Sequence, residues 1–175
     1  MTSTLKVNTL ESASGSTITI PTGKTLVGTD NSSLVAPGMI IQIVSASFNT
    51  AVYTTSTSFV SSGHTVTITP KFSNSKILIC HRGTVYNEGN NLHQYRTVYR
   101  GGAALSGNEG FTLHSAGTSS SGRWSSMGFD YLDSPATTSS TTYTMYYRTN
   151  SSSSNSYYCY GTLYPQVTTL YEIAQ

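Results

Sequence analysis

Apolar and polar residues alternate with a period of two along most of the chain after residue 38, as is typical of β-strands. The run HTVTITP at 64–70 places Val66 and Ile68 on one face, with threonines between them. A similar alternation occupies TTYTMYYRT at 141–149. Glycine, proline, serine and asparagine separate such runs. The pattern predicts eight or nine strands and no helix longer than a turn.

The predicted strands favour an all-β fold, specifically a jelly-roll-like antiparallel β-sandwich. Between two of them, the segment 133–140 contains Pro135, which has a fixed φ and no amide proton, so a connecting turn is expected there. The expected strands lie at 38–48, 64–70, 75–86, 92–100, 103–107, 123–133, 141–149, 156–164 and 167–174.

The first 37 residues have a different character, because they contain no aromatic residue and few large apolar ones. Such a segment cannot bury enough surface alone to offset its ordering entropy. We therefore expect an extended N-terminal segment, 1–37, that docks on something, followed by a sandwich head, 38–175. A flexible tail is the alternative. The candidate anchoring residues are Leu5, Val7, Leu10, Ile18 and Ile20.

Several strands carry large side chains on both faces, whereas one face of each sheet in a two-layer sandwich should be polar. Tyrosine offers a large apolar body with a polar tip and is enriched in protein interfaces. We therefore expect an outer face that packs against another subunit; singly exposed tyrosines are the alternative. The candidate interface residues are Tyr143, Tyr146, Tyr147 and Tyr158.

Charged residues make up only 9% of the chain, and the formal net charge is +2. The basic residues are scattered, so no cluster predicts a nucleic-acid partner. No apolar run approaches membrane-spanning length, and the N-terminus shows no signal-peptide pattern. These observations favour assembly in a cytoplasm without membrane insertion.

The residues that usually carry catalysis or bind metals form no recognised motif. The four histidines make no HxH or HxxxH pair, and no CxxC occurs, so neither a metal site nor a cofactor is expected. Asp130 and Asp133 are three apart in a strand and should face opposite sides. Cys80 and Cys159 are expected to be free thiols, because a cytoplasm is reducing. A disulfide between them, which would require their strands to be neighbours, is the alternative. We expect no enzymatic activity.

Short sequence pieces across nearly the whole chain resemble virion proteins of tailed phages of marine bacteria, cyanophages among them. These pieces are TLKVNTLES, ITIPTGKTL, SNSKILI, YRTVYRGG, YLDSPATTSSTTY and TLYEIAQ. The resemblance implies a short N-terminal attachment or stem segment and a β-sandwich head, commonly trimeric. It implies a tail-fibre-like or other appendage of the virion, assembled in the host cytoplasm, without enzymatic activity.

Two functional classes follow from this resemblance. In the first, the head of a homotrimer binds a glycan on the host surface, while residues 1–37 attach to other virion proteins of the tail or capsid. In the second, the protein is a capsid knob or decoration protein with no receptor role. A free carbohydrate-binding adhesin module is a third, weaker alternative. The candidate receptor contacts are Tyr95, Tyr99, Trp124, Asn90 and Asn91.

Overall fold

The computed structural model describes residues 20–28, 34–89, 91–115 and 122–175. By its contacts the chain divides into two compact units, Met1–Leu34 and Val35–Gln175. The predicted anchoring residues Leu5, Val7, Leu10 and Ile18 lie outside the described residues. Ile20 is described and is exposed.

In the first unit, Pro21 and Lys24 close a turn in which the Lys24 amide donates to the Pro21 carbonyl at 3.0 Å. Gly23 has a φ of 78°, which suits the third position of such a turn.

Within the described residues, the regular elements of the second unit are all β-strands. This confirms the all-β prediction. No helix in this part of the chain is long and apolar enough to cross a membrane. The strands are β1 (Ile40–Phe48), β2 (Val52–Thr54), β3 (Val60–Ile68), β4 (Lys76–Asn87), β5 (His93–Arg100), β6 (Ala103–Ala104), β7 (Thr112–Ser115), β8 (Arg123–Asp133), β9 (Thr141–Thr149), β10 (Ser156–Cys159) and β11 (Gln166–Ile173).

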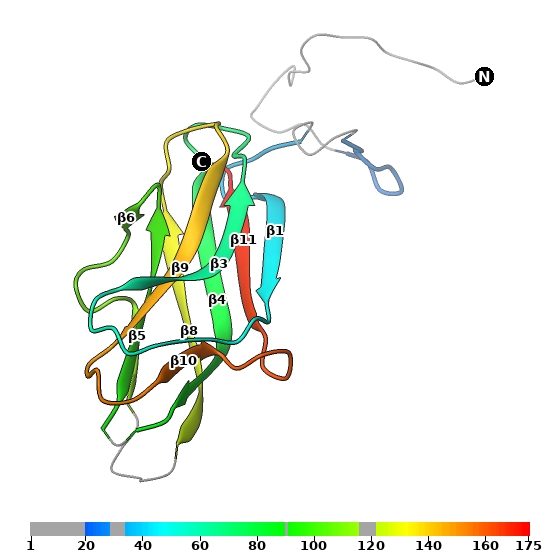
Figure 1. Cartoon of the computed structure of the whole chain (residues 1–175). Coiled ribbons are helices and arrows are strands. Elements are labelled where there is room, and N and C mark those ends of the chain that lie inside the picture. Colours follow the sequence, from blue (N-terminus) through cyan, green and yellow to red (C-terminus); the bar gives the residue numbers. More distant parts are fainter. Residues whose placement is uncertain (1–19, 29–33, 90, 116–121) are drawn as a thin grey trace. The chain divides into compact units, whose positions relative to one another are not determined.

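Two antiparallel sheets face each other as a sandwich (Figure 1). The first sheet has the order β1-β11-β4-β10-β2, with β8 also paired to β4. The second has the order β3-β9-β5-β6, with β7 also paired to β5. The short strands β2 and β7 add to the predicted ones, and β6 covers only the first two residues of the strand expected at 103–107. The expected turn after residue 132 is confirmed, because β8 ends at Asp133 and β9 begins at Thr141.

Alternate side chains from both sheets form the apolar core between the layers. Ile77, Ile79 and Leu170 come from the first sheet, and Val98 and Met145 face them from the second. All five are at most 1% exposed. The alternation read from the sequence thus becomes an inner and an outer face on each sheet.

Three of the four predicted interface tyrosines belong to this core. Tyr143, Tyr147 and Tyr158 are 0%, 2% and 0% exposed within a single chain, so they cannot contact another subunit. That part of the prediction is wrong. The interior accepts Tyr143 and Tyr158 because it offers partners for their buried hydroxyls. The Tyr143 hydroxyl donates to Asp133 Oδ2 at 2.7 Å. Asp130 lies on the outer face and Asp133 on the inner face, as expected.

A fully buried arginine lies in the same interior, on β5. All five N–H groups of the Arg96 guanidinium have partners. Nε donates to Gln94 Oε1 at 2.7 Å, and Nη1 donates to Gln166 Oε1 at 2.7 Å and to His81 Nε2 at 3.1 Å. Nη2 donates to the carbonyls of Thr84 and Tyr158 at 3.0 and 2.9 Å. The cation therefore has only neutral partners, and burial lowers the pKa of Arg96 to about 10.

Two neutral histidines lie beside Arg96. Because arginine can only donate, His81 Nε2 is an acceptor and its Nδ1–H donates to Thr168 Oγ1 at 3.0 Å. His64 Nε2–H donates to the Ala46 carbonyl at 3.2 Å, and its Nδ1 accepts from the Tyr158 hydroxyl at 2.8 Å. Burial, with the Arg96 charge, lowers the pKa of His64 to about 4 and that of His81 well below its usual value.

Replacing Arg96 with leucine should destabilise the head strongly. The substitution would strand several buried acceptors, each costing about 1–3 kcal/mol, so we expect a loss of at least about 3 kcal/mol. Urea unfolding of R96L measures it. The control is R82A, because the Arg82–Asp130 ion pair is more than half exposed. R82A should change the free energy of unfolding by at most about 1 kcal/mol. Equal losses in both variants would contradict the argument.

The histidine pair predicts that stability falls in mild acid. Above pH 6.5 both histidines are neutral in the folded and unfolded states. As the pH drops below 6.5, the unfolded chain binds protons that the folded chain refuses until about pH 4 at His64, and lower still at His81. The free energy of unfolding should therefore decrease across this window.

The measurement is urea unfolding at a series of pH values. Each histidine adds a slope of up to about 1.4 kcal/mol per pH unit. H64Q is the control, because it removes one titrating group and should show a shallower dependence between pH 6.5 and 4. An identical slope in wild type and H64Q would contradict the assignment.

Candidate functional site

Four aromatic residues cross the outer face of the first sheet in one cross-strand row. Tyr53 on β2 pairs with Tyr157 on β10, Tyr157 pairs with Tyr86 on β4, and Tyr86 pairs with Trp124 on β8. Neighbouring ring centroids lie 5.1, 5.6 and 4.5 Å apart along this row. The contacts form a continuous series of rings across four strands.

The loop after β10 adds two more rings at the Trp124 end. Tyr160 meets Trp124 edge-on at 5.0 Å, and Tyr164 lies 4.6 Å from it. Tyr53, Trp124, Tyr160 and Tyr164 are 41–59% exposed, so part of each side chain is accessible from solvent. We call these six residues the aromatic patch: Tyr53, Tyr86, Trp124, Tyr157, Tyr160 and Tyr164.

Polar contacts and a glycine hold the patch in place. The Tyr157 hydroxyl donates to Glu88 Oε1 at 3.0 Å, and Asn155 Nδ2 donates to Glu88 Oε2 at 2.8 Å. Partial burial, with the Glu88 hydrogen bond and charge, raises the pKa of Tyr157 to about 12. A side chain at Gly122 would collide with the Tyr86 ring, so glycine makes room for it.

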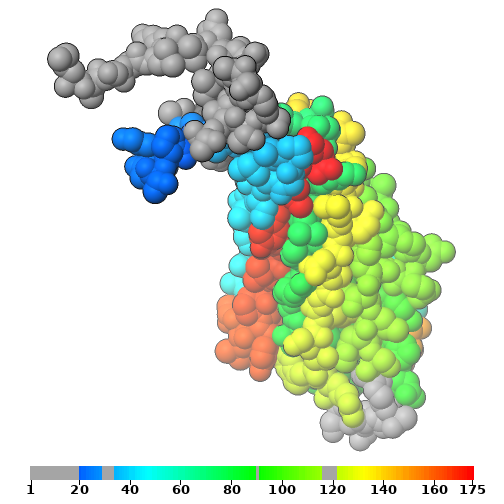
Figure 2. Space-filling view, turned by 180° about the vertical axis from the view of Figure 1, so that it is seen from behind, coloured from blue at the N-terminus to red at the C-terminus, as the bar shows by residue number. Residues whose placement is uncertain are grey.

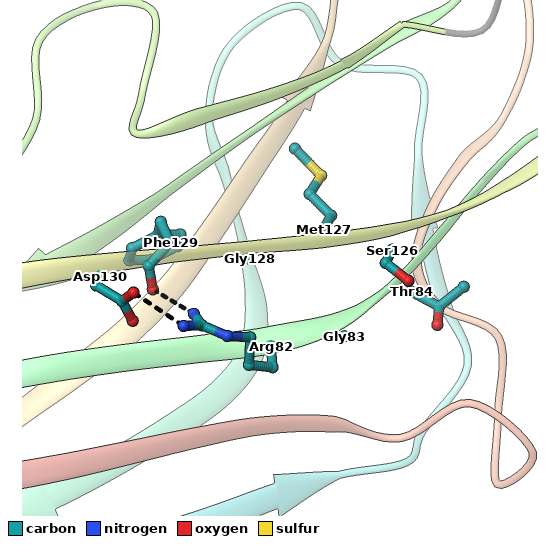
Figure 3. Close-up of a pocket in the computed structure, with 8 residues that line it drawn as sticks. All are labelled: Arg82, Gly83, Thr84, Ser126, Met127, Gly128, Phe129 and Asp130. Carbon is teal, nitrogen blue, oxygen red and sulfur yellow. Dashed lines mark hydrogen bonds and ion pairs between the residues drawn. The ribbon is translucent and has the colours of Figure 1, made fainter.

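A shallow hollow of about 500 Å³ lies on β4 and β8, the two strands that carry Tyr86 and Trp124 of the patch (Figure 3). Arg82 extends across Gly128, where a Cβ would lie 2.9 Å from Arg82 Cδ. Its guanidinium donates to Asp130 Oδ2 at 2.8 Å and to the Phe129 carbonyl at 3.1 Å. Thr84 and Ser126 line the hollow between this ion pair and the patch.

The registers make the hollow and the patch neighbours. Along β4 and β8 the outer-face pairs are Arg82 with Gly128, Thr84 with Ser126, and then Tyr86 with Trp124. Successive pairs on one face are about 7 Å apart, because a strand rises about 3.4 Å per residue. Figure 2 looks onto this side of the sandwich, with β1 in cyan, β11 in red, β4 in green and β8 in yellow. A ligand can therefore contact hydroxyls, an ion pair and aromatic faces together.

The predicted receptor residues are divided between the two sheets. Trp124 lies in the aromatic patch, whereas Tyr95 and Tyr99 lie on the outer face of the second sheet. Tyr99 stacks on Tyr146, with ring centroids 3.8 Å apart, so a predicted interface residue and a predicted receptor residue form one surface. Asn91 is exposed, and Asn90 lies outside the described residues. Whether these residues bind a receptor stays a prediction.

Titratable groups do not gather into a reactive cluster in the described ranges. No group of three or more His, Cys, Asp or Glu there is placed to hold a metal ion. Cys80 and Cys159 are both free, Cys159 being buried. His81 points inward and Cys80 outward, as strand alternation predicts.

Sequence reasoning missed most of the aromatic patch. Tyr86 and Tyr157 point outward because their strand neighbours Val85, Asn87 and Tyr158 are buried, and side chains alternate along a strand. Alternation does not reveal that β10 pairs with β4, because the paired residues Asn87 and Ser156 have 68 residues between them in the chain. Repeated tyrosines at 157, 158, 160 and 164 were the available signal.

Comparisons with known proteins gave limited similarity. No family model matches the chain, and no curated protein matches it. Among solved structures, a chain from the structure of infectious bursal disease virus Gx strain is similar, with a TM-score of 0.46 and 12% identity. The similarity covers 86% of this chain but only 37% of the viral chain.

Proposed function

We propose that this chain is a non-enzymatic structural protein of a phage virion whose sandwich head binds a neutral glycan of the host surface. The resemblance of the sequence to virion proteins of marine phages motivates the virion role. In this proposal residues 1–37 attach the head to the tail or capsid. The observation that carries the binding role is the exposed aromatic patch beside a polar hollow.

The chemistry of the patch suits sugars. Pyranose rings present C–H faces that pack on aromatic rings, and their hydroxyl groups need hydrogen-bonding partners. Ligand sites generally combine apolar and aromatic walls with a few polar groups that fix orientation. The patch supplies the rings, while Thr84, Ser126 and the Arg82–Asp130 pair supply donors and acceptors.

A binding role without catalysis is consistent with the acids near this site. Among the described residues that line the hollow, Asp130 is the sole acid, and it is paired with Arg82. Glycosidases usually need two carboxyl groups on either side of the scissile bond. The hollow offers one.

A second row on the same outer face supports self-association. Four residues are paired in register across β1, β11, β4 and β8: three aliphatic residues, Ile43, Leu78 and Leu132, and one tyrosine, Tyr171. We call them the aliphatic row. Ile43 and Leu132 are 58% and 51% exposed. We propose that this aliphatic row, in place of the buried tyrosines, contacts other copies in a homotrimer. The trimeric state itself comes from the resemblance.

Replacing Trp124 with alanine should weaken binding of a neutral oligosaccharide by at least about fivefold, corresponding to about 1 kcal/mol of lost stacking. Trp124 is the single tryptophan of the chain, so in the wild type its fluorescence reports directly on the patch. Screening a panel of neutral glycans identifies the probe, and calorimetry measures its affinity for both proteins.

The matched control is L132A, at the other end of β8 on the same outer face. It should bind a monovalent oligosaccharide as the wild type does. The glycan-binding proposal is wrong if no neutral glycan changes the Trp124 emission, and a decoration protein without a receptor role then becomes the better proposal.

Light scattering at several concentrations should give three times the chain mass of 18.7 kDa for the wild type. L132D should dissociate the trimer, because it places an unpaired charge in the aliphatic row. S126D, an equally charged change on the same strand outside that row, should remain trimeric. A monomeric wild type would refute the trimer and leave the glycan test unaffected.

A further inference from the structure

A second candidate surface lies on the opposite sheet, around Arg148 on the outer face of β9. Its guanidinium stacks on the Tyr95 ring, 3.8 Å from the centroid, and lies 5.4 Å from the Phe59 centroid. The side chain is only 14% exposed. Arg148 is thus a cation held in one orientation by two aromatic rings.

A carboxylate already occupies the open edge of this guanidinium. Glu109 Oε2 accepts from Arg148 Nη2 at 3.0 Å, yet the Glu109 side chain is 76% exposed. Hollows of about 470 and 270 Å³ lie beside Glu109, and Glu109 lines both. The larger falls within the range of roughly 300–1,000 Å³ usual for small-ligand sites.

Backbone geometry fixes Glu109 in this position. The turn Gly107–Gly110 is closed by the Gly110 amide, which donates to the Gly107 carbonyl at 3.1 Å. Gly110 has a φ of 78°, and a Cβ there would collide with the Arg96 carbonyl. That carbonyl also accepts from the Phe111 amide at 2.8 Å, which ties the loop to β5.

The Glu109 contact is weak enough to be displaced. Ion pairs with one strongly exposed partner contribute little to stability. The arginine, in contrast, has further contacts besides Glu109. Its guanidinium lies against Tyr95 and Phe59, and it also donates to the carbonyls of Thr149 and Asn108 at 3.5 and 3.4 Å. Arginine binds planar carboxylates well through its fork of N–H groups.

We propose that the Arg148 surface binds the carboxylate of an acidic sugar, a hexuronate unit of a polysaccharide, and that Glu109 occupies the carboxylate position until the ligand displaces it. Tyr99 lines the larger hollow and Tyr95 the smaller one, so aromatic side chains lie beside the guanidinium for contact with the sugar ring. This surface is distinct from the aromatic patch and is selective for charge rather than for a neutral sugar.

The test measures binding of glucuronate to the full chain by NMR titration or calorimetry, with glucose and acetate as matched probes. Wild type should bind glucuronate more tightly than either. E109Q removes the competing charge and should raise the affinity by up to about fivefold, the factor equivalent to about 1 kcal/mol. R148K keeps the charge but loses the planar fork, and it should lose most of the binding.

Each other outcome overturns part or all of the proposal. Equal binding of glucose and glucuronate would rule out charge recognition, and equal binding of acetate would rule out the sugar. Unchanged affinity in E109Q would show that Glu109 does not compete. Thermal unfolding of R148K verifies that it folds. W124A should bind glucuronate as the wild type does, which separates this site from the aromatic patch.

Discussion

The head depends on one buried cation that has no buried counter-ion. Arg96 is 0% exposed, and neutral amides, carbonyls and a histidine accept all five of its N–H groups. An ionised group inside a protein is tolerated only when its hydrogen bonds are satisfied. The acceptors come from both sheets: Gln94 from β5, and Thr84, Tyr158 and Gln166 from β4, β10 and β11. The network can be complete only when the two layers are aligned, so it specifies their relative position as well as contributing to stability.

The same network supports both outer surfaces through backbone neighbours. Tyr157 of the aromatic patch precedes Tyr158, whose carbonyl and ring both meet Arg96. Thr84 lines the polar hollow with its outward side chain and accepts from Arg96 through its carbonyl. On the other sheet, Tyr95 precedes Arg96 itself. Strand alternation makes this possible, since a residue locked inward leaves its neighbour pointing outward from a rigid backbone. Sites built on such strands are better ordered than sites on loops.

The sequence was sufficient for some features and insufficient for others, for physical reasons. Periodicity predicted the long strands, and Pro135 predicted the connection between β8 and β9. The prediction that Tyr143, Tyr147 and Tyr158 form an outer interface was wrong. We assumed that large side chains on both faces imply an outer interface, but Tyr143 and Tyr147 face a core that provides polar partners or room for them. The aromatic row depends on pairing between β10 and β4, and the contact of Glu109 with Arg148 joins residues 39 apart in the chain. Both are long-range contacts that no local pattern encodes.

The location of the few charged residues determines how binding at each proposed surface should depend on salt. With 9% charged residues, few charges are available for binding. Four of the five arginines, those at 82, 96, 100 and 148, have side-chain partners. A neutral aromatic patch binds through apolar contact, which salt hardly weakens. Salt weakens interactions between exposed charges, in contrast, because the Debye length is only about 8 Å at physiological ionic strength. Arg148 lies between these limits, because the rings around it exclude water from much of the guanidinium. The two proposed binding surfaces should therefore respond differently to salt.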